Sequence, residues 1–394
     1  MRRIVILFIV LASLPVAVSS ALYIEAPDYD SGIASTGVTD ATNGRYGDVI
    51  FATDAGISVY TANGTWYSVN ARHPGETPYG MLAPLGTMVT AVALDHEGHL
   101  WIGYPNGLQI GDGEEYRTID DQQFLKNRNI NCMARWGDEM WVATGQAGLH
   151  RYHDGVWTWC QPLGAEGLAC YTVTSMVVDA ASDVLVIGSE RDGIQVVRKG
   201  TGDARFEQVV HEGERMRGIS GVRTDPFGGV YLFNRTTVFH YTPAGEVTPV
   251  LDVEDLSAFP VSIHDLAATP GGLLLIASDK GIYGWNSSGV AMHITSGDGL
   301  RSNFVKKLFI DADGRCWFVV SGNVGYVPPM TEADVLALSA VPAQTPEAHE
   351  GTVETSTEAQ TPTPTGEPAG VLEGAWASLM EWLGAVGAKA ASGG

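Results

Sequence analysis

The chain has few cysteines and few positive charges, and it lacks the motifs of common catalytic sites. Four of its 394 residues are cysteine, and no Cys-x-x-Cys pair occurs, so a zinc framework is not expected. Only 23 Lys and Arg stand against 45 Asp and Glu, a net charge of −22, so no basic stripe is available to neutralise nucleic-acid phosphates. There is no Gly-x-Ser-x-Gly, His-Glu-x-x-His or Walker sequence. We therefore assign no catalytic residue, no metal and no cofactor from the sequence.

The first apolar run is too short for a comfortable membrane span. Ile4 to Val18 follows the positively charged start Met1-Arg2-Arg3 and precedes small residues that end at Ala21. This order is typical of a secretory signal peptide. We predict a signal peptide over residues 1–21 and an exported protein, extracellular or associated with the cell surface. An uncleaved signal anchor is the alternative.

The chain is rich in glycine, with 48 residues, and a sequence motif repeats about every 44 residues. Its clearest copy runs from Asp95 through Gly98 and Trp101 to Gly103. The equivalent central positions are Ile50, Trp101, Trp141, Val186, Tyr231, Leu275 and Trp317. A period of this length, built from short strands and turns, is the signature of a β-propeller blade. The sequence predicts an all-β fold, a seven-bladed β-propeller over residues 22–329.

Each copy predicts a strand, a tight turn and a second strand. In the turn that starts at Asp95, the aspartate offers local hydrogen bonds and Gly98 a positive φ. No blade buries both faces alone, so the ring needs every neighbour. The seventh copy supplies three strands and then reaches Pro328-Pro329, so its outer strand is missing. We expect residues 22–24, at the mature N-terminus, to supply that strand and close the ring.

The seventh copy also carries a family resemblance. Residues 299–317, from Gly299-Leu300 to Cys316-Trp317, resemble the two-component-regulator propeller repeat, and the second and third copies match its latter half. The resemblance covers about residues 22–327. It implies a propeller that senses or binds a ligand, although this chain has no room for a kinase. A weaker resemblance is to streptogramin-lyase-like propellers, whose chemistry would need a histidine and a glutamate on one face. His264 and Glu214 are the candidate pair in this sequence.

Because exported proteins can form disulfides, the four cysteines are candidates for one. Cys160 and Cys170 are separated by nine residues in the connection between the third and fourth copies. We predict a disulfide there, worth about 2–3 kcal/mol in the chain-entropy model. Cys132 and Cys316 are expected to be unpaired and buried. Three sequons, at Asn63, Asn234 and Asn286, fall in or near turns and are candidate glycosylation sites.

The loops that enter the inner strands carry arginines, which are rare in this acidic protein. We predict a ligand site there for a small anionic or glycan ligand, formed by Arg72, Arg128, Arg217, Arg301 and Asn303. The alternative is that each arginine pairs with a nearby acid, as Arg217 could with Glu214, or lies in solvent.

The chain changes character after the last repeat. Residues 330–340 are expected to form a short helix or extension. Residues 341–370 are rich in Pro, Thr and Glu and lack Lys and Arg, which predicts a disordered linker or stalk. Residues 371–388 return to helical periodicity and predict an amphipathic helix that binds a cell-surface protein. One face of that helix is formed by Leu372, Trp376, Leu379 and Leu383.

Two classes of function follow from these patterns. The first is an exported, non-catalytic binding or sensor-type propeller with a ligand or partner site at the mouth of the central channel. The second is an extracellular lyase or hydrolase acting on polysaccharide or another polyanion. The lack of a recognisable catalytic constellation favours the first.

Overall fold

The protein is seen in a computed structural model that describes residues 23–25, 32–112, 114–198 and 204–330. The chain divides into two compact units, 1–343 and 344–394, and all of the described residues lie in the first. The predicted signal peptide, the linker and the C-terminal helix with Leu372, Trp376, Leu379 and Leu383 lie outside the described residues.

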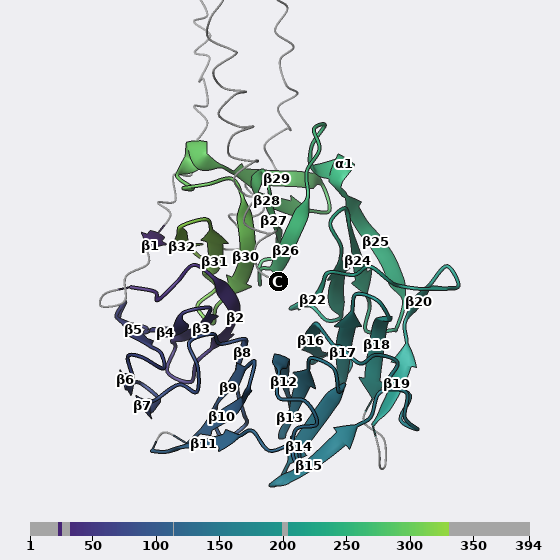
Figure 1. Cartoon of the computed structure of the whole chain (residues 1–394). Coiled ribbons are helices and arrows are strands. Elements are labelled where there is room, and N and C mark those ends of the chain that lie inside the picture. The colour runs from purple at the N-terminus through teal and green to yellow at the C-terminus, as the bar shows by residue number, and fades with distance from the viewer. Residues whose placement is uncertain (1–22, 26–31, 113, 199–203, 331–394) are drawn as a thin grey trace, which may run out of the picture. The chain divides into compact units, whose positions relative to one another are not determined.

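Within that part of the chain, seven four-stranded antiparallel sheets follow one another around a central channel (Figure 1). We number these blades 1 to 7 in chain order, so that blade 1 starts at Val38. The strands that line the channel are β2 (Val38–Asn43), β8 (Ala91–Leu94), β12 (Ile130–Trp136), β16 (Ser175–Asp179), β22 (Gly221–Thr224), β26 (Ile263–Ala268) and β30 (Val305–Ile310).

The second strand of every blade holds the repeat's central position, so the predicted sevenfold period is confirmed. These strands are short and almost wholly buried, which fits their runs of apolar and β-branched residues. They are β3 (Val49–Thr53), β9 (Leu100–Tyr104), β13 (Glu139–Thr144), β17 (Val184–Ser189), β23 (Val230–Phe233), β27 (Leu274–Ser278) and β31 (Cys316–Val320).

The two outer strands of each blade complete the sheets. The third strands are β4 (Gly56–Tyr60), β10 (Gly107–Gly111), β14 (Leu149–His153), β18 (Gly193–Arg198), β24 (Thr237–Tyr241), β28 (Gly281–Asn286) and β32 (Asn323–Val327). The fourth strands are β5 (Trp66–Val69), β11 (Tyr116–Ile119), β15 (Val156–Cys160), β19 (Arg205–Gln208), β25 (Val247–Asp252) and β29 (Gly289–Ile294) in blades 1 to 6, and β1 (Tyr23–Glu25) in blade 7. β1 lies antiparallel to β32, with Tyr23 opposite Tyr326.

Smaller elements decorate the connections between blades. Two hairpins, β6–β7 (Gly75–Thr77 and Gly80–Leu82) and β20–β21 (Val210–His211 and Glu214–Arg215), project from the connections that follow β5 and β19. The single helical turn α1 (Val253–Leu256) and a 3-10 turn (Ser296–Asp298) lie in the connections into blades 6 and 7. Among the described residues, no helix is long and apolar enough to cross a membrane.

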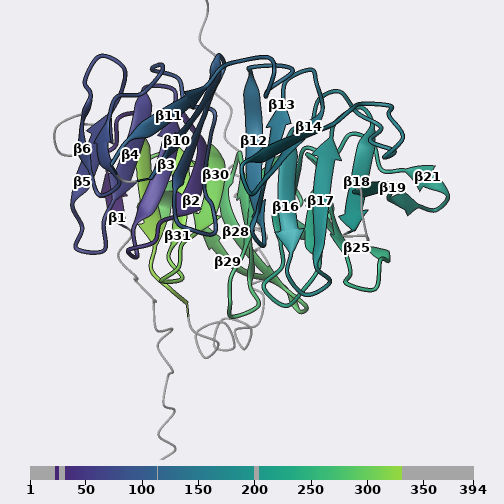
Figure 2. The same cartoon turned by 90° about the horizontal axis from the view of Figure 1, so that it is seen from below.

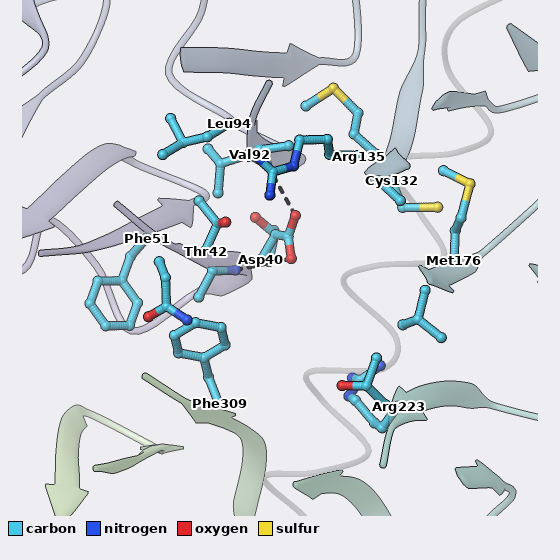
Figure 3. Close-up of a pocket in the computed structure, with 18 of the residues that line it drawn as sticks. Asp40, Thr42, Phe51, Val92, Leu94, Cys132, Arg135, Met176, Arg223 and Phe309 are labelled. Carbon is cyan, nitrogen blue, oxygen red and sulfur yellow. Dashed lines mark hydrogen bonds between the residues drawn. The ribbon is translucent and has the colours of Figure 1, made fainter. Parts of the chain in front are cut away.

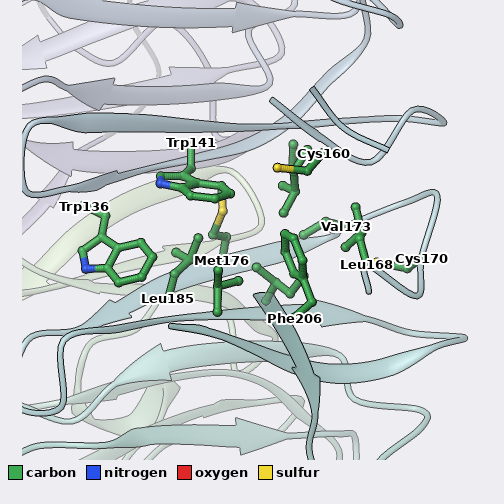
Figure 4. Close-up of a cluster of buried hydrophobic side chains, with 13 residues drawn as sticks. Trp136, Trp141, Cys160, Leu168, Cys170, Val173, Met176, Leu185 and Phe206 are labelled. Atoms are coloured by element: carbon green, nitrogen blue, oxygen red, sulfur yellow. The ribbon is translucent and has the colours of Figure 1, made fainter. Parts of the chain in front are cut away.

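The hydrophobic core is divided among the seven joints between neighbouring blades. Each joint has its own cluster of buried side chains, and Figure 4 shows the cluster between blades 3 and 4. There Trp141 and Trp136 of blade 3 pack against Leu185 and Phe206 of blade 4. Because each cluster takes side chains from two sheets, no blade buries its core without its neighbours.

The strand order gives the ring two distinct faces. Every inner strand runs in the same direction, so all connections between blades enter the inner strands at one face, which we call the entry face. The turns between first and second strands lie at the opposite face, which we call the turn face (Figure 2). At the turn face, Gly98 and Gly314 have φ of +82° and +81°, as the repeat predicts for its turn glycine.

Candidate functional site: the central channel

The central channel encloses a cavity of about 880 Å³ to which all seven inner strands contribute (Figure 3). A volume of this size matches that of a small-molecule site. Four inner strands carry a β-bulge near their start, at β2, β12, β26 and β30. The residues that follow the bulge in these four inner strands are Asp40, Cys132, Asp265 and Lys307. Each lies opposite a small or β-branched residue of the second strand. The same ladder position in the other blades holds Ala91, Ser175 and Gly221.

Asp265 is held by groups from three blades. It is 2% exposed and lies 2.6 Å from the guanidinium Nη2 of Arg223. Its carboxylate also accepts hydrogen bonds from the backbone N–H of Leu266, at 2.8 Å, and of Leu308 on the next inner strand, at 3.1 Å. A buried carboxylate with this many donors is satisfied, and removing Arg223 would leave it without its counter-charge. Asp265 therefore clamps blades 5, 6 and 7 together at the channel wall.

Asp40 repeats this arrangement two blades further round the ring. Its carboxylate accepts from the N–H of Ala41 and from the N–H of Val92 on the next inner strand, both at 3.0 Å. Burial raises the pKa of Asp40, against the lowering effect of these hydrogen bonds and of the charge of Lys307. Lys307 donates to the carbonyl of Thr39 at 2.6 Å and so links blade 7 to blade 1.

Of the inner-strand residues that line the cavity, three are Arg or Lys and two are carboxylates. The oxygens of both carboxylates accept backbone hydrogen bonds, whereas Arg135, Arg223 and Lys307 each line the cavity with a cationic group. Arg135 is exposed, and its Nη1 donates to the Asp95 carbonyl at 3.3 Å. Figure 3 shows Arg135, Asp40 and Arg223 around the same opening. An anionic group can be held here by charge-assisted hydrogen bonds.

The arginines predicted from the sequence lie in the connections at the entry face, outside the set of residues that line the cavity. Arg72, Arg128, Arg217 and Arg301 are all exposed. Within the part of the chain that the structure describes, none of the four makes an ion pair, so Arg217 is not paired with Glu214. Arg128 and Arg301 come two and four residues before inner strands, whereas Arg72 comes three residues after the outer strand β5. Their role in binding stays a prediction.

Asn303 has a structural partner. Its side-chain oxygen accepts a hydrogen bond from the backbone N–H of Ser296 at 2.6 Å, which holds the two ends of the loop before blade 7 together. Asn303 is half-buried. A ligand role for Asn303 also stays a prediction, and it would have to use the side-chain nitrogen.

Large apolar side chains are exposed mainly at the same connections. Of the thirteen exposed large hydrophobic residues in the described ranges, eight lie between the outer strand of one blade and the inner strand of the next. A concentration of this kind is typical of an interaction surface. The eight are Met81, Met88, Phe124, Leu163, Tyr171, Val210, Phe259 and Phe304.

The histidine and glutamate considered for lyase chemistry are not brought together by hydrogen bonding. His264 lies on inner strand β26, where its Nδ1 is 2.7 Å from the Val305 carbonyl and its ring packs on Phe304 at 4.5 Å. Glu214 is exposed on β21 and pairs in the ladder with His211 of its own hairpin. His264 is thus committed to holding blade 6 against blade 7.

The cysteines depart in part from expectation. Cys132 is half-buried: it packs against the cluster between blades 3 and 4 and also lines the channel, whereas Cys316 is buried as predicted. Cys160 and Cys170 belong to the same buried cluster, but Cys170 is a thiol in the structure and forms no disulfide (Figure 4). Burial raises the pKa of Cys170 to about 12, which makes the thiol unreactive at neutral pH. The Cys160–Cys170 bond remains a prediction for the oxidised protein.

The three sequons lie in or next to turns, as predicted. Asn63 is exposed between β4 and β5, Asn234 lies between β23 and β24, and Asn286 ends β28. The side-chain oxygen of each accepts a hydrogen bond from the residue two positions on, as in an Asx turn. Their glycosylation stays a prediction.

Comparisons with known proteins show the fold. No family model matches the chain, and no curated protein matches it. Among solved structures, the extracellular domain of a hybrid two-component system of B. thetaiotaomicron is 17% identical with a TM-score of 0.59. That match covers 78% of this chain, which spans only 40% of the other protein's domain.

Streptogramin B lyase is 13% identical with a TM-score of 0.57, and the match covers 77% of this chain and 97% of the lyase. A catalytically inactive virginiamycin B lyase from Staphylococcus aureus, solved with quinupristin, has the same identity and TM-score. At these identities the likeness establishes a shared propeller fold and nothing about activity.

Proposed function

We propose that this chain is an exported, non-catalytic binding propeller of the sensor type, which takes an anionic or glycan ligand at its entry face and channel mouth. The observation that carries the proposal is the state of the channel's charged groups. Asp40 and Asp265 accept backbone hydrogen bonds that hold neighbouring blades together. Three cationic side chains line the same cavity: Arg135 and Lys307 each donate to one carbonyl, and Arg223 pairs with Asp265. Each of the three has further N–H donors that an anion can use. A general acid or base needs a carboxyl group that is available to the substrate, whereas binding of an anion needs the cations.

The entry face adds the second support. Arg128 and Arg301 are exposed there without an acidic partner in the described residues, and aromatic rings such as Tyr171 and Phe304 are exposed in neighbouring connections. Arginine recognises a carboxylate through paired N–H donors. Aromatic rings supply apolar contact surface at low cost in side-chain entropy. A chain of sugar units that bears carboxylates matches both features.

The shared fold is consistent with this role. The B. thetaiotaomicron match is an extracellular domain of a signalling protein. We infer an extracellular place for this chain as well, in agreement with the predicted signal peptide over 1–21. In this proposal β1 closes the ring through its pairing with β32, and the segments 341–370 and 371–388 tether the propeller to a cell-surface protein.

The test is binding of a short oligogalacturonate by isothermal titration calorimetry, with the neutral oligomer of the same length as reference. The double variant Arg128→Ala/Arg301→Ala should bind the acidic oligomer at least about tenfold more weakly, since charge-assisted contacts are lost. Arg205→Ala, which removes an exposed arginine from outer strand β19, is the matched control and should bind normally.

Equal binding of the acidic and neutral oligomers would contradict the anionic ligand. Release of an unsaturated sugar product, followed by ultraviolet absorbance, would instead support the alternative of an extracellular polysaccharide lyase.

A further inference from the structure

A second cavity of about 640 Å³ lies between blades 2 and 3 at the turn face. Its deepest walls are apolar: Trp101 and Met140 are buried, and Tyr152 is half-buried. Its rim is acidic, with one arginine, Arg117, against six carboxylates. The six are Asp95, Glu97, Asp112, Glu115, Asp138 and Asp154.

The turn at the edge of this cavity is repeated in blade 7. Asp95 accepts from the N–H groups of residues 97 and 99 at 3.0 and 2.8 Å, and from the Trp101 indole at 3.0 Å. Asp311 accepts from residues 313 and 315 at 3.0 and 2.9 Å, and from the Trp317 indole at 2.8 Å. The two turns are therefore the same structure, with Glu97 in the place of Asp313 and His99 in the place of Arg315.

The strand ladders extend this equivalence across the joints. Tyr60 pairs with Trp66 in blade 1, as Tyr152 pairs with Trp157 in blade 3. Tyr326 lies opposite Trp317 in blade 7, and Ile110 lies opposite Trp101 in blade 2. The joint between blades 7 and 1 is thus a template for the joint between blades 2 and 3.

In the template the chain supplies its own cation. The Arg315 Nε lies 2.6 Å from Asp311, and its Nη2 lies 3.0 Å from Asp313. The guanidinium carbon is 5.6 Å from the Tyr60 ring and 5.3 Å from the Tyr326 ring. Paired carboxylates and aromatic faces are the two features that stabilise a guanidinium group in proteins.

In the joint between blades 2 and 3, His99 stands in the place of Arg315 and supplies no guanidinium group. The His99 Nδ1 lies 3.1 Å from Asp95 and 3.3 Å from Glu97, so the imidazole takes over both carboxylate contacts of Arg315. Because histidine is the shorter side chain, it has no group in the place of the guanidinium carbon between the two blades. The cavity lies at that place, with Trp101, Ile110 and Tyr152 among its walls.

From this internal comparison we infer that the cavity between blades 2 and 3 is a binding site for a guanidinium group, supplied by a ligand rather than by the chain. The aromatic floor receives the guanidinium plane and the rim carboxylates neutralise its charge. The site shares only the turn at residues 95–97 with the channel cavity, and it takes a cation where the proposed channel site takes an anion. It does not depend on the proposed function.

The closest alternative for this cluster is a metal ion. Asp95, Glu97 and His99 each offer one ligand atom, and these atoms lie within 4.8 Å of one another. Both carboxylate oxygens of Asp95, however, already accept hydrogen bonds, from the N–H groups of the turn and from the Trp101 indole. Burial raises the pKa of Asp95, but these hydrogen bonds outweigh it and hold the pKa below its ordinary value. In blade 7 the same turn binds a guanidinium with its acids in place, which favours an organic cation.

The probe is Nα-acetyl-arginine amide, compared by calorimetry with Nα-acetyl-citrulline amide, its uncharged isostere. The full chain should bind the arginine compound with a dissociation constant on the order of 1 mM or below, and it should bind the citrulline compound at least about tenfold more weakly. Equal affinity for the two, or saturable binding of zinc without binding of the arginine compound, overturns the proposal. A Gly-Arg-Gly peptide distinguishes the source: tighter binding than the amide indicates an arginine of a partner protein, and equal binding a free small molecule.

The decisive variant is His99→Arg, which installs the side chain of the template. It should fill the cavity, abolish binding of the arginine compound and keep or raise the Tm. A folded His99→Arg protein that binds as the wild type does would overturn the proposal. Should that variant fail to fold, Asp138→Asn and Glu97→Gln, both at exposed rim positions, should each weaken binding about threefold. Asp313→Asn, the template's counterpart of Glu97→Gln, is the control and should leave binding unchanged.

Discussion

Among the described residues, blade 7 meets blade 1 through a network of five contacting aromatic rings and an arginine, whereas the network between blades 2 and 3 has three aromatic rings and a histidine. In the first joint, Trp317 lies 5.1 Å from Phe51, 5.0 Å from Tyr60 and 4.9 Å from Tyr326, with Trp66 at 6.0 Å. In the second, Trp101 lies 5.2 Å from Tyr152 and 5.9 Å from Trp157. The same turn and the same indole hydrogen bond serve both joints.

The difference follows the path of the chain. Blades 2 and 3 are joined by a direct connection, so their joint forms between neighbours in sequence. The strands β2 to β5 of blade 1 and β30 to β32 of blade 7 come from opposite ends of the described chain, so these two blades meet through side-chain and backbone contacts. Lys307 and Asn43 add hydrogen bonds across that joint, to Thr39 and from Ala312. The closing joint between blades 7 and 1 therefore has more stabilising contacts, whereas the joint between blades 2 and 3 contains a cavity.

The largest expected effect is on the closing joint. Trp317→Ala should reduce the free energy of unfolding by about 4–5 kcal/mol, because it removes a fully buried indole and four aromatic contacts. Trp101→Ala should cost about 3–4 kcal/mol, since it loses fewer ring contacts. Urea denaturation of both variants measures the difference. An equal or larger loss for Trp101→Ala would mean that ring closure is not reinforced by this cluster.

The sequence predicted the parts of this comparison that repeat. The seven central positions all lie on second strands, and the Asp95 and Asp311 turns form as the repeat indicates. Strand periodicity and glycine at positive φ are local properties, so they can be read one copy at a time. The partners across a joint cannot, because Tyr60 and Trp317 are more than 250 residues apart along the chain.

The channel residues were missed for a related reason. Asp40, Asp265 and Lys307 occupy one ladder position of the inner strand, whereas the predicted site consisted of charged residues in the loops. A signal was present: this position is Ala91, Cys132, Ser175 or Gly221 in the other blades, so a charged residue there departs from the pattern of its own repeat. A polar residue at a position that repeats as a small one marks a local conflict, and such conflicts concentrate at functional sites.

The second prediction removes the cation of the closing joint. Arg315→Met should cost about 3 kcal/mol of unfolding free energy, because Asp311, whose side chain is 1% exposed, would keep its charge without its counter-ion. The equivalent change in the open joint, His99→Met, should cost less than half as much, because water screens that contact more: the side chains of His99 and Asp95 are 28% and 9% exposed, against 13% and 1% for Arg315 and Asp311. Equal losses measured by urea denaturation would show that His99 acts as a full counterpart of Arg315.

The third prediction concerns acid. His150, fully buried on β14, accepts a hydrogen bond from the Lys126 N–H in the connection from blade 2 to blade 3, and burial lowers its pKa to about 4. Since the folded state holds this histidine neutral while the unfolded chain protonates near pH 6.5, stability is complete above that pH and falls as pH decreases toward 4. The loss at pH 5 should be about 2 kcal/mol.

His150→Gln keeps an acceptor and removes the titration. Its free energy of unfolding, measured in urea at pH 7 and at pH 5, should change by about 2 kcal/mol less between the two than that of the wild type. The same pH dependence in both proteins would place the acid sensitivity elsewhere in the ring.

The smallest expected effects are on the two equivalent acidic turn residues, Asp313 beside Arg315 and Glu97 beside His99. Asp313 has a half-exposed side chain, and its 3.0 Å contact with Arg315 is a partly solvated ion pair, so Asp313→Asn should cost about 0.5 kcal/mol. Glu97 faces five other carboxylates around its cavity and contacts only the His99 ring, at 3.3 Å. Removing its charge relieves repulsion, so Glu97→Gln should leave the Tm unchanged or raise it slightly at low ionic strength. A measurable loss of stability in Glu97→Gln would mean that the contact between Glu97 and His99 stabilises the second joint as Arg315 stabilises the first.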